Sequence, residues 1–330
     1  MAYTIKIEGG PEFQAAPGES ILSAALRSNV GFPYDCSSGG CGSCKFELRS
    51  GELSNFWEEA PGLNERDRRK KKSLACQCSA VSDLCISVRV GDEYLPPITP
   101  QKQIATLAAI RNVTHDMYEV TLTTEEKASF LPGQYALIAT PGLNRPRVYS
   151  MSNQPNADGQ WKFIIRRVPG GTFSDKHLLT SEIGSKFFLD GPYGMAWYRK
   201  QSPRKVLCIA GGSGLAPTVS IASAAAADGK ECHLFFGART SKDTLSNQML
   251  EHIGLANLPI QAVQAISTPE DDWCGQTGFI HEVVKEQLGD RIKNFEIYLA
   301  GPPPMIEALQ DLLFLQLGIS VDQVHQDRFF

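Results

Sequence analysis

The sequence predicts a multidomain chain of α+β and α/β type, with a small β-grasp unit, an antiparallel β-barrel and a doubly wound parallel sheet. Three observations lead to this prediction. A glycine- and cysteine-rich loop follows a short helix near the start, strand-like segments fill the middle, and buried strands alternate with helices near the end. With 330 residues the chain can form two or three cores, and we expect domains at 1–95, 103–200 and 203–330.

The first unit opens with strand patterns around one helix. Residues Tyr3–Ile7 alternate like an edge strand, and Glu12–Gln14 can pair with them. Ser20 is a typical N-cap for a helix that would run to Asn29. Further strands are expected at 45–48 and 84–90, with a polar excursion to residue 72 between them. The segment PPITPQK at 96–102 is stiff and extended, as expected of a linker between domains.

The middle and last units differ in their periodicity. Proline and glycine punctuate short strand segments in the rhythm of an antiparallel barrel, with strands expected at 118–123, 135–140, 148–151, 161–168 and 186–189. After Pro203, apolar strands alternate with helices, which predicts a parallel sheet. These strands are expected at 206–210, 233–237, 260–266 and 297–300, and the helices near 217–228, 243–252, 279–288 and 303–317.

Composition excludes several classes of protein. Thirty-two Lys and Arg against 36 Asp and Glu give a net charge of −4, which offers nucleic acid no general electrostatic footprint. No stretch approaches the ~18 apolar residues of a spanning helix, and the start MAYTIKIEGG lacks the features of a signal peptide. We therefore expect a cytoplasmic protein with no nucleic acid and no membrane partner. The nine cysteines favour metal ligation over disulfides.

Four cysteines form the strongest chemical motif. Cys36, Cys41 and Cys44 follow the C-x4-C-x2-C spacing of plant-type [2Fe–2S] sites, and Cys76 is expected to complete the set. Glycines between the ligands would let the backbone wrap closely and aim its N–H groups at the sulfurs. A zinc knuckle or reduced core thiols are the alternatives, although zinc sites favour two separated cysteine pairs.

The fourth ligand is ambiguous because Cys78 lies two residues beyond Cys76. We take Cys76 as the ligand. The remaining cysteines are then expected to be ordinary buried thiols, namely Cys78, Cys85, Cys208, Cys232 and Cys274.

Two motifs in the middle unit suit a flat, phosphate-bearing cofactor. In Arg147-Val148-Tyr149-Ser150, the Arg can hold a phosphate, the Tyr can cover a heterocycle and the Ser can donate to a ring nitrogen. The segment 169–174 is a glycine turn that leads into a helix N-terminus, which is a ready anion site. Either motif alone is better explained as a plain turn or cap.

The last unit contains a glycine loop after its first strand. Residues 211–217 read GGSGLAP, which suits a tight turn that presents a helix N-terminus to a pyrophosphate. Pro217 occupies the place of the third glycine of G-x-G-x-x-G, so a classical Rossmann dehydrogenase is the wrong template. The last predicted strand ends in AGPPP, at the carboxyl edge where open α/β sheets bind ligands.

The chain resembles the reductase components of bacterial aromatic-ring oxygenases through six motifs that occur in the same order. These motifs are the cysteine motif, RVYS, GGTFS, GGSGLAP, AGPP and the terminal DRFF. Those proteins fuse a plant-type ferredoxin domain to a ferredoxin–NADP⁺ reductase-like module. The resemblance spans essentially the whole chain and is strongest to carbazole-type dioxygenase and toluene-type monooxygenase reductases, through stretches such as FPYDCSSGGCGSCKFEL and TGFIHEVV. It implies electron flow from NADH through FAD and a [2Fe–2S] cluster to a Rieske-type ferredoxin or a terminal oxygenase.

The same resemblance implies roles for individual residues. Arg147 would contact the FAD pyrophosphate, Tyr149 would stack on the isoalloxazine, and Ser150 would approach the flavin N5. Phe329 or Phe330 would cover the other flavin face and yield to nicotinamide, unless these rings simply dock the tail; with Tyr149 and Ser150 they form the expected catalytic set. The other expected cofactor-binding residues are Arg166, Gly171, Thr172, Ser174, Gly212, Ser213, Gly214, Pro217, Gly301 and Pro302.

Coenzyme choice rests on the segment after the second parallel strand. Asp243 could bond a ribose hydroxyl and repel a 2′-phosphate, whereas Arg239 and Lys242 could pair with that phosphate. We expect NADH rather than NADPH. Ala300 stands where many relatives carry Cys near the site of hydride transfer, which affects the tuning of the transfer and not the reaction itself.

Two other functions remain open at this point. The chain could be a stand-alone NAD(P)H-dependent flavin or ferric reductase, or an iron–sulfur redox sensor, although no basic domain face supports DNA binding. The basic run RDRRKKK at 66–72 is either a solvated loop or a docking site for an acidic partner.

Overall fold

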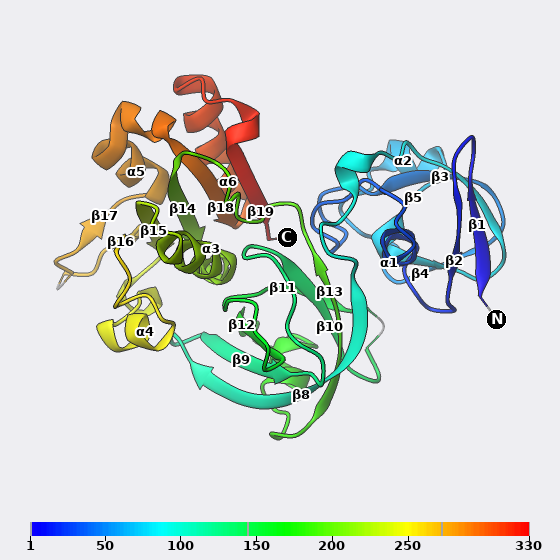
Figure 1. The fold of residues 1–330 in the computed structure, drawn as a ribbon, viewed down its shortest axis with the longest axis horizontal. Coiled ribbons are helices and arrows are strands. Elements are labelled where there is room, and N and C mark those ends of the chain that lie inside the picture. Colours follow the sequence, from blue (N-terminus) through cyan, green and yellow to red (C-terminus); the bar gives the residue numbers. More distant parts are fainter. Residues whose placement is uncertain (1, 144, 272, 330) are drawn as a thin grey trace.

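A computed structural model describes residues 2–143, 145–271 and 273–329. Figure 1 shows three domains in sequence order, with the N-terminal domain set to one side of the barrel and the parallel-sheet domain. The C-terminus lies near the centre of the molecule, where the three domains approach one another (Figure 1). The predicted fold class is confirmed.

The N-terminal domain is a mixed sheet that grasps one helix. The sheet order is β2-β1-β7-β3-β5, with β1 antiparallel to β2 and parallel to β7. Ser20 caps α1 as expected, since its side chain accepts the Ser23 N–H at 3.1 Å. The elements are β1 (Tyr3–Ile7), β2 (Glu12–Ala15), α1 (Ile21–Arg27), β3 (Lys45–Ser50), β4 (Leu53–Asn55), α2 (Glu65–Arg69), β5 (Lys72–Leu74), β6 (Cys78–Ala80) and β7 (Leu84–Ser87).

The second domain is a six-stranded antiparallel barrel with strand order β11-β10-β13-β8-β9-β12. A bridge between Met151, just after β11, and Phe163 in the middle of β12 brings these two strands together and nearly closes the barrel. Its strands are β8 (Gln101–Asn112), β9 (Met117–Thr123), β10 (Tyr135–Ala139), β11 (Arg147–Ser150), β12 (Gln160–Arg166) and β13 (Lys186–Tyr193). The sequence did not predict β8, because only Ala105 and Leu107 along it are buried and the apolar alternation is weak.

The third domain is a parallel sheet of order β17-β16-β15-β14-β18-β19. Helix α3 packs on β14 and β15, while α5 and α6 belong to a second core on the opposite face. Its elements are β14 (Lys205–Gly211), α3 (Leu215–Ala227), β15 (Cys232–Ala238), α4 (Asn247–His252), β16 (Ile260–Ile266), β17 (Gln276–Thr277), α5 (Ile280–Leu288), β18 (Phe295–Gly301), α6 (Pro303–Gln310) and β19 (Val324–Arg328).

The N-terminal domain packs directly against the barrel. Tyr135, Leu137 and Tyr193 of the barrel are buried in the same apolar cluster as the N-terminal core. Arg27 at the end of α1 forms an ion pair with Asp190 of β13 at 2.7 Å. The two domains therefore share buried side chains and are not connected by the linker alone. Within the described residues, no helix is both long and apolar enough to cross a bilayer.

Candidate functional site

The four predicted cluster ligands form two close pairs of sulfurs. The Sγ atoms of Cys36 and Cys41 are 3.1 Å apart, and those of Cys44 and Cys76 are 3.3 Å apart. Both separations are too long for a disulfide and fit two thiolates that share one metal ion. Two such pairs fit the two irons of a [2Fe–2S] cluster, each held by two cysteines.

The backbone around these sulfurs is shaped for an anionic group. The Cys41 N–H donates to the Cys36 sulfur at 3.4 Å, and the Ser43 N–H donates to the Cys41 sulfur at 3.5 Å. Gly42 has φ +79°, and a Cβ atom there would lie 2.8 Å from the Gly62 carbonyl oxygen. A side chain at this position would therefore open the loop that wraps the site.

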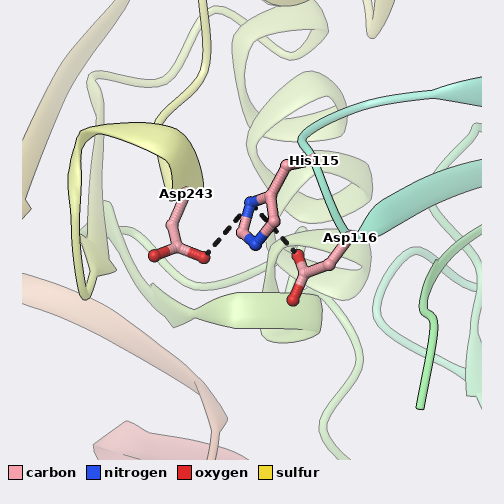
Figure 2. Close-up of side chains that lie close together, drawn as sticks. All are labelled: His115, Asp116 and Asp243. Atoms are coloured by element: carbon pink, nitrogen blue, oxygen red, sulfur yellow. Dashed lines mark ion pairs between the residues drawn. The ribbon is translucent and has the colours of Figure 1, made fainter. Parts of the chain in front are cut away.

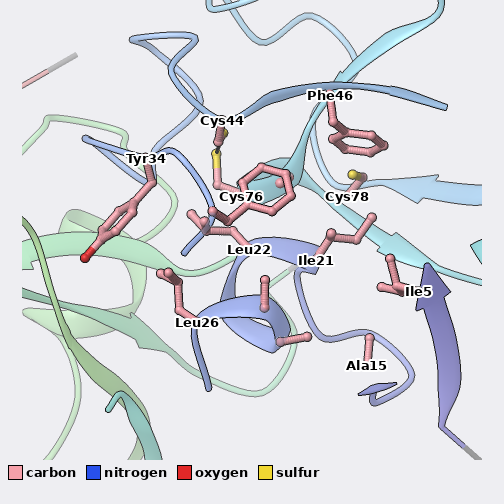
Figure 3. Close-up of a cluster of buried hydrophobic side chains, with 14 of the residues drawn as sticks. Ile5, Ala15, Ile21, Leu22, Leu26, Tyr34, Cys44, Phe46, Cys76 and Cys78 are labelled. Atoms are coloured by element: carbon pink, nitrogen blue, oxygen red, sulfur yellow. Dashed lines mark hydrogen bonds between the residues drawn. The ribbon is translucent and has the colours of Figure 1, made fainter. Parts of the chain in front are cut away.

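Cys78 lies apart from the four sulfurs. Its side chain is buried beside Phe46, and its thiol donates to the Leu74 carbonyl at 3.2 Å, whereas Cys76 lies directly beside Cys44 (Figure 3). The expectation of buried thiols was wrong for two other cysteines. Cys274 is exposed. Cys85 is half-buried, because it alternates with the core residues Leu84 and Ile86 on β7 and faces away from that core.

A cavity of about 450 Å³ lies between the barrel, β19 and the cysteine loop. Arg147, Tyr149 and Ser150 line it from β11, and Gly171, Thr172 and Ser174 line it from the turn after β12. The Tyr149 ring stacks on Phe173 with 5.7 Å between ring centroids, and burial raises the pKa of its phenol. Cys36 and Ser38 line the same cavity, which brings the cysteine loop to its wall.

The turn after β12 is fixed by its own hydrogen bonds. The Ser174 hydroxyl accepts the Val168 N–H at 3.0 Å, and Asp175 accepts the Gly170 N–H at 2.7 Å. The helix predicted to follow this turn is a single π-helical turn over Ser174–Leu178. Arg147 donates to the Arg145 carbonyl at 3.0 Å, which holds its guanidinium at the cavity wall.

Asp327 is a cavity residue that the sequence analysis missed. It is buried on β19 and accepts a hydrogen bond from the Ser150 hydroxyl at 3.0 Å. Burial raises its pKa to about 7, the nearby Asp35 adds to this rise, and the Ser150 hydrogen bond opposes it. Only the position before Arg328-Phe329 in the terminal DRFF motif could have drawn attention to it.

A second cavity, of about 670 Å³, lies at the carboxyl edge of the parallel sheet. Gly212, Ser213, Arg239, Asp243 and Pro302 line it. Gly214, Pro217 and Gly301 do not line it: Gly214 ends the turn after β14, Pro217 lies in the first turn of α3, and Gly301 ends β18.

The turn is tight at Gly214 and Ala300. A Cβ atom on Gly214 would lie 2.0 Å from the Ala300 carbonyl oxygen, so only glycine lets the turn after β14 approach the end of β18. The Ala300 side chain is buried.

Three residues line both cavities, namely Arg166, Ser213 and Phe329. Phe329 therefore lies at the junction where the contents of the two cavities would meet, and its N–H donates to the Gly301 carbonyl at 3.1 Å. Phe330 lies outside the described residues.

Asp243 belongs to a charged cluster at the junction of barrel and parallel sheet (Figure 2). One carboxylate oxygen accepts the Thr240 N–H at 3.0 Å, and the other lies 3.8 Å from His115 Nδ1. Arg166 lies 3.0 Å from Asp116 and 3.7 Å from Asp243. The guanidinium supplies the positive charge that the two carboxylates require, so the cluster needs no metal ion.

Four clustered thiols, a barrel cavity beside them and a sheet-edge cavity that meets the barrel cavity define an iron–sulfur flavoprotein reductase. Three family profiles match the chain, described as a 2Fe-2S iron-sulfur cluster binding domain over residues 5–81, an oxidoreductase FAD-binding domain over 104–198 and an oxidoreductase NAD-binding domain over 208–311. The chain is therefore an oxidoreductase that uses a [2Fe–2S] cluster, FAD and a nicotinamide coenzyme.

Full-length relatives narrow this class. The chain is 43% identical to the ferredoxin–NAD(P)(+) reductase CarAd of Metapseudomonas resinovorans, over 99% of this chain and 100% of the relative. It is 32% identical to the xylene/toluene monooxygenase electron transfer component XylA of Pseudomonas putida, over 99% and 93%. The solved ferredoxin reductase in carbazole 1,9a-dioxygenase superposes with a TM-score of 0.94 at 42% identity, over 100% and 99%. The chain belongs to the ferredoxin–NAD(P)⁺ reductase components of oxygenase systems, which confirms the resemblance seen in its motifs.

Proposed function

We propose that this chain carries electrons from NADH to a Rieske-type ferredoxin or directly to the terminal oxygenase of an aromatic-ring hydroxylating system. One observation supports the path of electrons within the chain, from the nicotinamide site to the cluster. The cavity lined by Arg147, Tyr149 and Ser150 shares Phe329 with the sheet-edge cavity and is also lined by Cys36. A cofactor in this central cavity would touch both the electron donor and the cluster loop.

The cofactors supply complementary electron chemistry, because nicotinamide gives two electrons as hydride, a [2Fe–2S] centre takes one, and FAD exchanges either number. The residues of this chain position these groups. We infer that Cys36, Cys41, Cys44 and Cys76 are the iron ligands, supported by their two sulfur pairs.

We assign FAD to the central cavity. Arg147 would hold its pyrophosphate together with the N–H groups of Thr172 and Ser174, while the Gly171 N–H closes the turn by donating to the Val168 carbonyl at 2.8 Å. The Ser150 hydroxyl would face the flavin N5, with Asp327 fixing its orientation. Arg166 would serve both nucleotides from the junction.

We assign the nicotinamide nucleotide to the sheet-edge cavity, with NADH as the coenzyme. Its helix N-terminus at Gly212 and Ser213 suits a pyrophosphate. Asp243 places a carboxylate in the cavity wall, which would repel the 2′-phosphate of NADPH. Arg239 is exposed at the same cavity and is the residue best placed to oppose this preference.

The partner is proposed to dock on a basic surface beside the cluster loop, formed by Arg66, Arg69, Lys70 and Lys71. All four residues are exposed, and among them only Arg69 has an ion-pair partner, Glu65. An acidic partner would complement this charge and would be steered toward it before contact.

The basic surface is tied to the cluster loop by its neighbours. Asp67 of α2 pairs with Lys45, the residue after Cys44, at 2.7 Å. Arg68 donates to the carbonyls of Glu58 and Ala60, in a segment whose Gly62 N–H bonds to the Gly39 carbonyl at 2.9 Å. The partly exposed Cys41 lies in this loop, so a partner on the basic surface would approach the cluster.

Acceptor choice tests the proposed function. We expect Cys76→Ser to abolish the visible iron–sulfur absorption and the NADH-dependent reduction of cytochrome c, while ferricyanide reduction through FAD remains. Cys78→Ser is the matched control and should leave all three unchanged, because its sulfur faces Leu74 and Phe46. Cytochrome c reduction that survives loss of the cluster would support a stand-alone flavin reductase instead, and loss of the cluster only in Cys78→Ser would overturn the ligand assignment.

A further inference from the structure

A buried tyrosine of the barrel is hydrogen-bonded to both neighbours of a cluster cysteine. The Tyr135 hydroxyl donates to the Asp35 carbonyl at 2.5 Å and lies 2.7 Å from the Ser37 hydroxyl oxygen. Asp35 and Ser37 flank Cys36 in the sequence. A single phenol from the second domain therefore binds the backbone of Asp35, before Cys36, and the side chain of Ser37, after it.

The Tyr135 and Ser37 hydroxyls each have a hydrogen-bond acceptor for their proton. Because the phenol proton goes to the Asp35 carbonyl, the Ser37 hydroxyl must donate its own proton to the phenol oxygen. Tyr135 is 2% exposed and Ser37 is 7% exposed, so water does not compete for these bonds. Burial raises the pKa of Tyr135 well above its ordinary value, so the phenol remains a donor at physiological pH.

Tyr135 also pairs, through its strand, with a residue that lines the central cavity. On β10 it pairs with Ser150 of β11 in the antiparallel register, and Ser150 lines the cavity that also contains Cys36 in its wall. Tyr135 itself does not line this cavity. It therefore connects the strand that carries Ser150 to the loop that carries Cys36 without occupying the space between them.

The other described contacts between these domains do not reach the residues next to Cys36. Tyr193 donates to Ser23 of α1 at 3.0 Å, and Arg27 pairs with Asp190 at 2.7 Å. Arg145 lies over the Trp57 ring at 3.8 Å. The Tyr34 hydroxyl, two residues before Cys36, donates to the Met195 sulfur at 3.6 Å. Among the hydrogen bonds described between these two domains, those of the Tyr135 hydroxyl reach the two residues that flank Cys36.

We propose that Tyr135 is a positioning residue for electron transfer, whose phenol holds the Cys36 loop against the flavin cavity and so sets the rate at which the cluster is reduced. This inference rests on the proposed function, in that FAD fills the central cavity and Cys36 is an iron ligand. Electron transfer requires close approach of the two cofactors. A small displacement of a reacting group can cost about 100-fold in rate.

The test is Tyr135→Phe, which removes the hydroxyl and keeps the ring. In anaerobic stopped-flow mixing with NADH, we expect bleaching of the flavin at the parent rate and reduction of the cluster about 10- to 100-fold more slowly. A second readout does not depend on turnover: hydrogen–deuterium exchange of the amides over 35–41 should be faster in the variant. Both are measured on protein with full FAD and iron–sulfur absorption, so that failure of the proposed cofactor sites would be recognised separately.

Tyr193→Phe is the matched control, because it removes the hydroxyl of a buried tyrosine in the same interface. In the parent, the Tyr193 ring stacks on the Tyr135 ring with 6.1 Å between ring centroids. We expect this variant to leave cluster reduction at the parent rate. Ser37→Ala removes the other partner of the same phenol and should slow cluster reduction in the same direction, which tests the inference even if Tyr135→Phe folds poorly. Parent-rate cluster reduction in Tyr135→Phe, or equal slowing in Tyr193→Phe, would overturn the role of Tyr135.

Discussion

At the scale of single residues, the charged side chains in the two cavities lead to predictions about coenzyme choice and pH response. The sequence singled out Asp243 and Arg239 as opposing selectors. The structure places both in the wall of the same cavity, and it also engages one oxygen of Asp243 with Thr240. The variant that tests its charge should therefore keep an acceptor for Thr240, which Asp243→Asn does.

We expect the parent to prefer NADH, and Asp243→Asn to lower the ratio of kcat/KM for NADH to that for NADPH about tenfold, the equivalent of ~1.4 kcal/mol. Arg239→Ala should raise this ratio, because it removes the cation available to a 2′-phosphate. Ferricyanide is the acceptor in both measurements. A parent that prefers NADPH and loses this preference in Arg239→Ala would show that Arg239 is the selector, and no change in either variant would locate the contact on another loop.

Asp327 makes stability depend on pH. The unfolded chain releases this proton above pH 3.8, whereas the folded protein holds it up to about pH 7. Its contribution to stability is thus present below pH 3.8 and is lost as pH rises to about 7, by at most about 4 kcal/mol. Asp327→Asn cannot ionise but can still accept from Ser150, so it should unfold at a higher temperature than the parent at pH 8 and at the same temperature near pH 4. An equal difference at both pH values would contradict the raised pKa.

Some residues were predictable from sequence because their chemistry depends on local spacing. The three cysteines over 36–44 are of this kind, and so are Arg147, Tyr149 and Ser150 on one short strand. Asp327 and Tyr135 were not predictable, because their roles come from contacts with residues 177 and about 100 positions away. No local pattern marks a carboxylate or a phenol that meets its partner across domains.

At the scale of elements, the structure shows how the polar segment before residue 72 folds and how it presents the basic run at 66–72. It forms β4 and α2, and Asn64 caps α2 by accepting the Asp67 N–H at 2.9 Å. The short helix exposes the basic run on one surface. Lys71 adopts φ +53°, a left-handed conformation uncommon for a residue with a side chain.

Charge reversal of this basic surface tests the proposed docking. With Arg66→Glu, Lys70→Glu and Lys71→Glu combined, we expect the second-order rate of reduction of an acidic Rieske ferredoxin to fall at least about tenfold at low ionic strength. The dependence of this rate on salt should also weaken, while ferricyanide reduction is unchanged.

The matched control is the combination Lys6→Glu, Arg111→Glu and Lys127→Glu, which makes the same change in net charge at exposed positions on β1 and the barrel. It should leave the rate within about twofold of the parent. If both triple variants slow the reaction equally, net charge and not the basic surface governs association, and if neither does, the partner docks elsewhere.

Element boundaries were predictable where periodicity was strong and uncertain where tertiary contacts decide. The parallel strands β14, β15 and β18 are buried on both faces and were visible as apolar runs. Strand β16 was also predicted, although only its last two residues, Ala265 and Ile266, are buried. The edge strand β19 was not predicted, because its sequence VHQDR is polar and it is held by pairing with β18. The helix expected to 317 ends as an α-helix at Gln310 and continues as a π-helical turn to Gln316.

At the scale of the whole molecule, the order of motifs along the chain predicted three units, and their arrangement explains how they act together. The C-terminal strand β19 returns to the centre of the molecule (Figure 1). Its Asp327 lines the barrel cavity, and Phe329, just after the strand, lines both the barrel cavity and the sheet-edge cavity. On the other side, the N-terminal domain presents Cys36 to the same barrel cavity. The barrel is thus placed between the donor site and the cluster.

We infer from this arrangement that FAD is the obligatory step between coenzyme and cluster. The most direct test is anaerobic stopped-flow mixing of NADH with the FAD-loaded protein and with FAD-free protein that retains its cluster. We predict that the flavin bleaches first and the cluster second in the loaded protein, and that NADH leaves the cluster oxidised in the FAD-free protein although dithionite reduces it. Reduction of the cluster by NADH at the same rate without FAD would contradict the account.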